Sequence, residues 1–210
     1  LPGSDKELAK QAIIFSAHLD HIGVSGTTGD TINNGADDDA SGVTGVLTLA
    51  DAYAALPNAP KRSVIFITFW GEEKGLLGSK HYAKNPAWPL EDTVANLNLE
   101  MLGRPEAGAH GKTWMTGWHQ SDLGELMATG SQEAGVLVFE HPKLSSFLYR
   151  MSDNWPLAEK GVVAHSFSAG SLHKDYHQPT DEWEKLHLDH MTKVIRGLFA
   201  GSLPIANGEV

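Results

Sequence analysis

The chain has 210 residues, of which 41% are hydrophobic, and it contains no cysteine. This length suffices for one domain with a sizeable core, and without cysteine a bound metal must be held by histidine and carboxylate ligands. The formal net charge of -10 argues against nucleic acid and anionic membranes as partners, and no run of about 18 apolar residues is present that would predict a membrane span.

The N-terminal segment, residues 1–10, has no charged start followed by an apolar stretch, so it does not match an intact signal peptide. The chain begins with Leu1 rather than methionine and enters a strand-like segment soon afterwards. We expect residues 1–210 to form a single domain that lacks N-terminal residues of a longer precursor.

Two apolar segments near the start are predicted to be buried strands. Residues 11–17 are Gln-Ala-Ile-Ile-Phe-Ser-Ala, and residues 61–70 contain Ser-Val-Ile-Phe-Ile-Thr-Phe-Trp, with little alternation in either. Between them, residues 41–56 repeat apolar positions at helical spacing and are followed by Pro57. A strand, a crossover helix and a second strand predict parallel pairing with a right-handed connection.

The alternation of strand and helix patterns continues to the end of the chain. Further strands are predicted at residues 93–101, 113–116, 136–139 and 162–168. Further helices are predicted at residues 76–84, 122–134, 155–160 and 188–203, while residues 143–150 fit neither pattern. This order predicts a three-layer α/β/α sandwich with a mostly parallel mixed central sheet, in which ligands bind at the carboxyl ends of the strands.

Residues 35–43, Gly-Ala-Asp-Asp-Asp-Ala-Ser-Gly-Val, place three adjacent acids between small residues just before the first predicted helix. Adjacent carboxylates raise one another's pKa unless a cation lies among them, and small neighbours leave room for one. The alternative is a solvated acidic turn with Ser41 as a helix N-cap. Asp38, in the middle, is the natural ligand to bridge two cations.

Histidine and acidic residues also follow the first two predicted strands. His18 and Asp20 point the same way on an extended segment, so the Asp20 carboxylate is expected to accept a hydrogen bond from His18 and fix its tautomer. His21, which follows directly, is given no role. Glu72 and Glu73 follow the second strand, where one can bind a metal while the other stays free as a base. For each pair, an ordinary surface loop is the alternative.

The ends of the third and last predicted central strands supply Glu100 and His177. Glu100 lies within Asn-Leu-Glu-Met-Leu-Gly, and a buried, unpaired glutamate needs a cation or a proton. His177 lies in the loop of residues 175–181. The five predicted ligands of two cations about 3.5 to 4 Å apart are His18, Asp38, Glu73, Glu100 and His177.

In this order, these motifs resemble the M28 family of co-catalytic zinc aminopeptidases, and the resemblance extends from Ile13 to Leu186. The matching motifs are His-x-Asp at 18–20, Asp-Asp-x-Ser-Gly within 37–42, Glu-Glu at 72–73 and the last histidine ligand at 177. The resemblance implies a di-zinc enzyme, with manganese or cobalt as possible substitutes, that removes N-terminal residues from peptides. It also implies a secreted or periplasmic protein.

The resemblance further implies a division of roles among the predicted residues. One metal would be bound by His18, Asp38 and Glu100, and the other by Asp38, Glu73 and His177. Glu72 would be the general base that activates a water bridging the metals, with Asp20 supporting the catalytic site. A cis peptide bond between Asp38 and Asp39 is also implied.

Two positions depart from the family pattern, and several functions stay open. Glu100 stands where the family often has aspartate, and Ser152-Asp153-Asn154 replaces Ser-Asp-His. Met101 is either a wall of a side-chain pocket or ordinary core, with core favoured. The alternatives to an aminopeptidase are a glutaminyl-cyclase-like acyl transferase, a carboxypeptidase or amino-sugar hydrolase, and a non-catalytic receptor-type domain. The other eight histidines are expected at the surface.

Overall fold

The centre of the molecule is a sheet built from the predicted apolar segments, as the computed structural model of residues 1–210 shows. The strands are β1 (Ala12–His18), β2 (Ser63–Phe69), β3 (Thr93–Glu100), β4 (Lys112–Met115), β5 (Leu137–Phe139) and β6 (Ala164–Ser168). They are arranged in the order β2-β1-β3-β6-β4-β5, and all neighbouring pairs are parallel except β4 with β6. The predicted mixed, mostly parallel sheet is confirmed.

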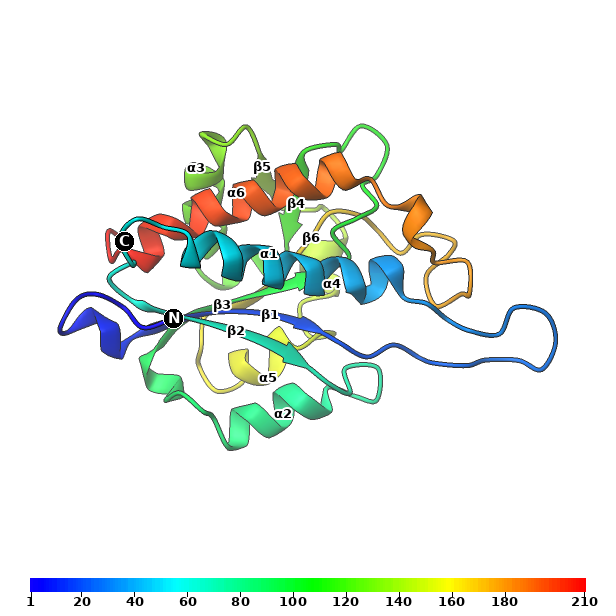
Figure 1. Ribbon diagram of the computed structural model, residues 1–210, viewed down its shortest axis with the longest axis horizontal. Coiled ribbons are helices and arrows are strands. Elements are labelled where there is room, and N and C mark those ends of the chain that lie inside the picture. Colours follow the sequence, from blue (N-terminus) through cyan, green and yellow to red (C-terminus); the bar gives the residue numbers. More distant parts are fainter.

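Helices cover both faces of this sheet (Figure 1). They are α1 (Gly42–Ala54), α2 (Leu77–Lys84), α3 (Leu123–Gln132), α4 (Leu144–Phe147), α5 (Asn154–Ala158) and α6 (Leu188–Ala206). Short 3-10 turns lie at Leu8–Lys10, Leu90–Asp92, Trp118–Gln120 and Trp183–Lys185. None of the helices is both long and apolar enough to cross a bilayer.

The two faces differ in the size of the core that they bury. On one face, α1, α3 and α6 pack over a cluster of 22 buried residues that includes Phe15, Leu97 and Leu198. The crossing of α3 and α6 depends on two glycines, because a Cβ on Gly130 would lie 2.7 Å from the Cα atom of Gly201. On the other face, α2 and α5 cover a cluster of only four buried residues. The predicted three-layer sandwich is therefore confirmed.

One prediction about the strands needs correction. Residues 61–70 were expected to form a strand buried on both faces, but β2 is the edge strand of the sheet, and its middle residues are half-buried. An apolar run without alternation indicated burial, yet the strands that are buried along their whole length, β1 and β6, lie inside the sheet rather than at its edge. Residues 143–150, left open by the sequence, contain α4.

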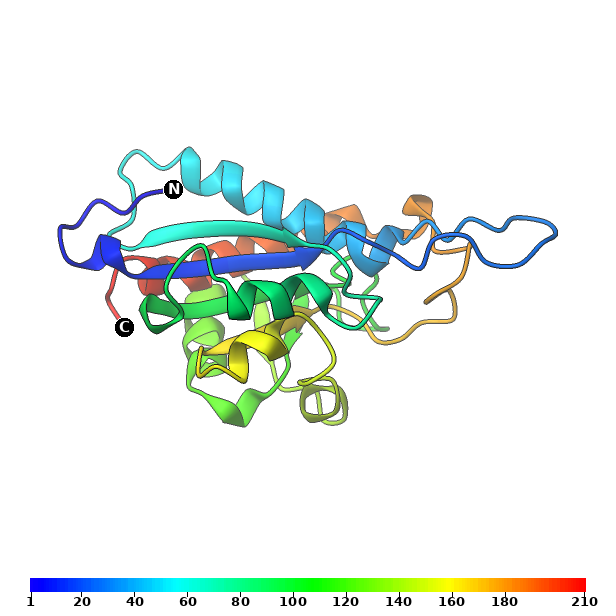
Figure 2. The ribbon, with the colours of Figure 1, turned by 90° about the horizontal axis from the view of Figure 1, so that it is seen from below.

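Parallel pairing brings the predicted site residues to one edge of the sheet. His18 at the end of β1 pairs with Phe69 at the end of β2, and Glu100 at the end of β3 pairs with Ser168 at the end of β6. The segment between β1 and α1 leaves this edge as a long hairpin of residues 22–34, which extends beyond the sheet in two perpendicular views (Figures 1 and 2).

Candidate metal centre

Two of the three adjacent acids serve the fold. The segment Ala36–Ser41, buried except at Ala40, forms a wide turn before α1, with the cis peptide bond between Asp38 and Asp39 that the family resemblance implied. Asp37 accepts a hydrogen bond of 2.7 Å from the backbone N–H of Gly103, and Asp39 accepts one of 3.0 Å from the backbone N–H of Met101. These bonds tie the turn to the chain that follows β3, and they leave Asp38 free to face the site.

Asp38 lies between two imidazoles from opposite ends of the chain. Its side chain is 5% exposed, with Oδ1 3.1 Å from Nε2 of His18 and Oδ2 3.2 Å from Nε2 of His177. Burial alone would raise the pKa of this carboxyl, but the neighbouring imidazoles of His177 and His18 hold the pKa below its ordinary range. One carboxylate thus faces two sets of ligands, as the predicted bridging role requires.

The first set consists of His18, Asp38 and Glu100, whose ligand atoms lie within 4.8 Å of one another. Nδ1 of His18 lies 2.9 Å from the backbone carbonyl oxygen of Asp20. Because a carbonyl only accepts hydrogen bonds, Nδ1 carries a proton, and Nε2 is the ring atom that faces Asp38 and Glu100. Burial opposes a charge on His18, but Glu100, Asp38 and Asp39 outweigh it and raise the pKa of the imidazole to about 12.

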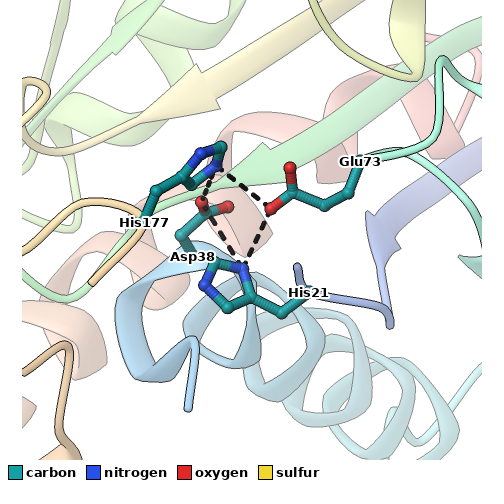
Figure 3. A group of neighbouring side chains, drawn as sticks. All are labelled: His21, Asp38, Glu73 and His177. Carbon is teal, nitrogen blue, oxygen red and sulfur yellow. Dashed lines mark ion pairs between the residues drawn. The ribbon is translucent and has the colours of Figure 1, made fainter. Parts of the chain in front are cut away.

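The second set consists of His21, Asp38, Glu73 and His177 (Figure 3). Oε1 of Glu73 lies 3.1 Å from Nε2 of His177 and 2.9 Å from Nδ1 of His21. The sequence predicted three of these four residues and missed His21. Its position three residues after His18 was visible, but nothing in the sequence showed that the chain turns back there toward Glu73.

Asp20 lies at the site with a different role from the predicted one. Its carboxylate was expected to accept a hydrogen bond from His18, but the nearest oxygen is 3.9 Å from Nδ1, and the Asp20 backbone carbonyl accepts instead. The Asp20 carboxylate accepts from the backbone N–H groups of Gly71, Glu72 and Glu73, at 2.7, 3.1 and 3.3 Å. Asp20 therefore fixes the turn that carries the predicted base and one predicted metal ligand.

Glu72 belongs to neither set of ligands and lines a cavity of about 110 Å³ beside them. Burial and the nearby Glu100 raise the pKa of the Glu72 carboxyl to about 9. The apolar side chains of Met101, Trp114, Leu148, Met151 and Leu172 line the same cavity. Met101 is thus both buried and part of a cavity wall.

Polar neighbours hold the carboxylate of Glu100 in place. Ser152 donates a hydrogen bond to Oε1 of Glu100, and Asn98 donates a longer one of 3.3 Å to the same atom. The other oxygen, Oε2, lies 3.8 Å from Nε2 of His18. Burial raises the pKa of Glu100 to about 7, although the neighbouring His18 opposes this shift.

Asn154, which stands where the family pattern has histidine, forms hydrogen bonds that hold the fold together. The buried amide donates to the backbone carbonyl of Tyr149 at 2.9 Å and accepts from the hydroxyl of Ser166 at 2.9 Å. Asn154 therefore joins the start of α5 to β6 and is absent from both sets of ligands.

The expectation that the remaining histidines are at the surface is wrong for two of them. Nδ1 of His165 donates a hydrogen bond to the Thr116 carbonyl and its Nε2 pairs with the hydroxyl of Ser121, while His190 accepts from the backbone N–H of Gly111. Both are almost fully buried. Single histidines are generally expected at the surface. The hydrogen-bond partners of His165 and His190 come from distant segments of the chain, so their burial was not visible in the sequence.

The two sets of ligands fit divalent cations. Oδ2 of Asp38 and Oε1 of Glu73 are buried and form no hydrogen bond, although nitrogen atoms lie close to both. Buried carboxylate oxygens without partners are costly, whereas a cation between carboxylate and imidazole ligands would satisfy them. The donor set of imidazoles and carboxylates suits zinc.

Comparison with known proteins gives both a fold and a family. Aminopeptidase YwaD of Bacillus subtilis (strain 168) is 27% identical over 186 residues, which are 85% of this chain and 38% of YwaD. The structure of a zinc aminopeptidase from Bacillus subtilis has a TM-score of 0.73 at 24% identity, covering 91% of this chain and 45% of that one. Porphyromonas gingivalis glutaminyl cyclase has a TM-score of 0.70 at 16% identity, with 91% and 72% covered.

The chain spans less than half the length of the two aminopeptidases. The two solved structures are less than 25% identical to this chain, so their similarity shows a shared fold. The model of Peptidase family M28 matches residues 1–200. The chain therefore belongs to peptidase family M28.

Proposed function

We propose that this chain is a di-zinc aminopeptidase that hydrolyses N-terminal residues from peptides. The observation that carries the proposal is the position of Glu72, a carboxylate outside both sets of ligands that lines the same cavity as His18, Asp38 and Glu100. A free base beside two metal sites is the arrangement that hydrolysis with an activated water requires.

The residues that would hold the metals are those of the two sets. His18, Asp38 and Glu100 would hold one ion, and Asp38, Glu73 and His177 the other. When bound, these ions would lower the pKa of a water molecule between them and polarise the substrate carbonyl. Manganese or cobalt could replace zinc, since imidazole and carboxylate ligands bind all three.

Glu72 performs the proton transfers of the proposed reaction. It takes a proton from the attacking water and delivers it to the amine that leaves when the peptide bond breaks. The cations would lower the high pKa that burial and Glu100 give Glu72 in the metal-free chain, so that the carboxylate is ionised when it acts as a base.

The remaining groups orient the substrate. Its free amino group is a cation in water, and the carboxylates of Asp38, Glu73 and Glu100 make the site acidic, which would attract that charge. The side chain of the first residue would lie in the apolar part of the cavity, beside Met101 and Trp114. A blocked N-terminus lacks that charge, so the proposed enzyme would prefer peptides with a free N-terminus.

The test is an assay of the zinc-loaded chain on three peptides: one with a free N-terminal leucine, its N-acetylated form, and one with an N-terminal glutamine. An aminopeptidase releases leucine from the first peptide and nothing from the second. Ring closure of the glutamine peptide without release of an amino acid would indicate a cyclase, and no turnover of any peptide would indicate a non-catalytic domain.

A further inference from the structure

His21 is a largely buried histidine whose ring nitrogens have no hydrogen-bond partners. Its side chain is 9% exposed, and Nδ1 lies 2.9 Å from Oε1 of Glu73 and 3.7 Å from Oδ2 of Asp38. Nε2 of His177 faces the same two oxygens at 3.1 and 3.2 Å. The four atoms thus surround one centre, two nitrogens and two oxygens (Figure 3).

None of these four atoms forms a hydrogen bond, although they are close together and buried. Ion pairs joined by hydrogen bonds would point an N–H of each ring along the line to an oxygen. Here the distances are short but the directions do not meet that requirement. A cation bound among these four atoms would accept their lone pairs, which no hydrogen bond satisfies.

The backbone holds the His21 ring in this position. The hairpin of residues 22–34 is closed by a bridge between Val24 and Ile32, and its base brings Gly35 back against His21. A Cβ atom on Gly35 would lie 2.7 Å from Cγ of His21, so the ring packs directly on the glycine backbone. On its other side, the ring makes an edge contact with His177 at 5.5 Å between centroids.

We propose that His21 is a fourth protein ligand of the second metal, which rests on the proposed di-metal function. The two metal sites of this chain are then unequal. The second site has four protein ligands, His21, Asp38, Glu73 and His177, whereas the first has three, His18, Asp38 and Glu100. Zinc with four protein ligands is typical of closed, tightly held sites, and zinc with three leaves a position for water or substrate.

The inequality has a consequence for metal loading. The second site binds its ion first and more tightly, and the first site is the exchangeable one. An ion held by His18, Asp38 and Glu100 would then keep more coordination positions for water and substrate than its neighbour, and Glu72 lines the same cavity as these ligands.

The test is a competition titration of the full chain with zinc and a chelator, which gives two dissociation constants. His21→Asn replaces the imidazole with a shorter amide, and His21→Ala removes the side chain. His81→Ala, at an exposed position of α2, is the control. Removal of a group that only supports a ligand costs 10- to 100-fold in affinity, so loss of His21 should weaken the tighter site by at least about 100-fold and leave the weaker site within about threefold.

A spectrum distinguishes a ligand from a support. With one equivalent of cobalt bound, loss of a nitrogen ligand changes the visible absorption band, while loss of a supporting residue lowers affinity and leaves the band of the loaded site unchanged. Affinities and spectra of both His21 variants equal to those of the His81→Ala control would overturn the proposal. Failure of the unaltered chain to bind zinc would instead contradict the proposed function itself. Should His21→Ala not fold, as judged by circular dichroism, the same criteria apply to His21→Asn.

Discussion

The hydroxyl of Ser152 donates a hydrogen bond to the carboxylate of Glu100, and so links the turn before α5 to the end of β3. The contact occupies Oε1 and leaves Oε2 on the side of His18. Because partners of this kind orient metal ligands, Ser152→Ala should weaken the first metal site by about 10- to 100-fold.

Zinc titration against a chelator measures this effect. Ser131→Ala is the matched control, since Ser131 is also buried and its hydroxyl donates to a backbone carbonyl, that of Gly197, far from the site. The second site should keep its affinity in both variants. Equal affinities in Ser152→Ala and Ser131→Ala would show that Glu100 needs no support from Ser152.

Replacement of the proposed base separates catalysis from metal binding. Glu72→Gln keeps the size of the side chain but cannot accept the proton of the attacking water, so turnover of an aminoacyl-nitroanilide should fall by about 10²- to 10⁴-fold. Both zinc ions should remain bound, because Glu72 belongs to neither set of ligands. Glu125→Gln, in α3, is the control. Turnover equal to that of the control would remove Glu72 from its role.

Asp20→Ala should damage catalysis and metal binding together. Its carboxylate accepts hydrogen bonds from the backbone of Gly71, Glu72 and Glu73, and loss of those bonds frees the turn that positions both glutamates. The expected result is a lower kcat, as in Glu72→Gln, together with weaker zinc binding at the second site, which Glu72→Gln does not cause. A variant with reduced kcat and unchanged zinc affinity would show that Glu73 is held without Asp20.

A buried histidine away from the metal centre makes stability depend on pH. Burial and the neighbouring His110 and His187 lower the pKa of His190 to about 4, from an ordinary value of 6.5. As pH falls from 6.5 to about 4, the unfolded chain takes up a proton at this position and the folded chain does not. The free energy of unfolding therefore decreases over this window, by up to about 1.4 kcal/mol per pH unit.

His190→Asn should flatten this dependence, because an amide oxygen still accepts a hydrogen bond from the backbone N–H of Gly111 but does not titrate. Urea unfolding between pH 4 and 7, with excess chelator present for both proteins, measures the difference. Parallel curves for the variant and the unaltered chain would contradict a depressed pKa at His190.

Much of this site could be predicted because parallel strands end at one edge of a sheet. His18 and Glu100 end two neighbouring strands and Glu73 follows a third, so the pattern of strands was enough to bring them together. The acidic segment around Asp38 carried its own signal, three adjacent carboxylates that no apolar core needs.

The parts that could not be predicted depend on loops. The position of His21 follows from a hairpin that returns Gly35 to its ring, and no periodic pattern marks such a return. The Asp20 carboxylate was assigned to the wrong partner for a similar reason. His18 was the expected partner because it is close to Asp20 in sequence. The backbone N–H groups that donate to the Asp20 carboxylate instead belong to a turn about fifty residues later.

The central claim is that two cations lie on either side of Asp38. A crystal structure of the zinc-loaded chain, with anomalous difference maps recorded on both sides of the zinc absorption edge, tests it most directly. We expect two peaks about 3.5 to 4 Å apart, one beside His18 and Glu100 and the other among His21, Glu73 and His177. A single peak, or peaks that do not contact Asp38, would contradict it.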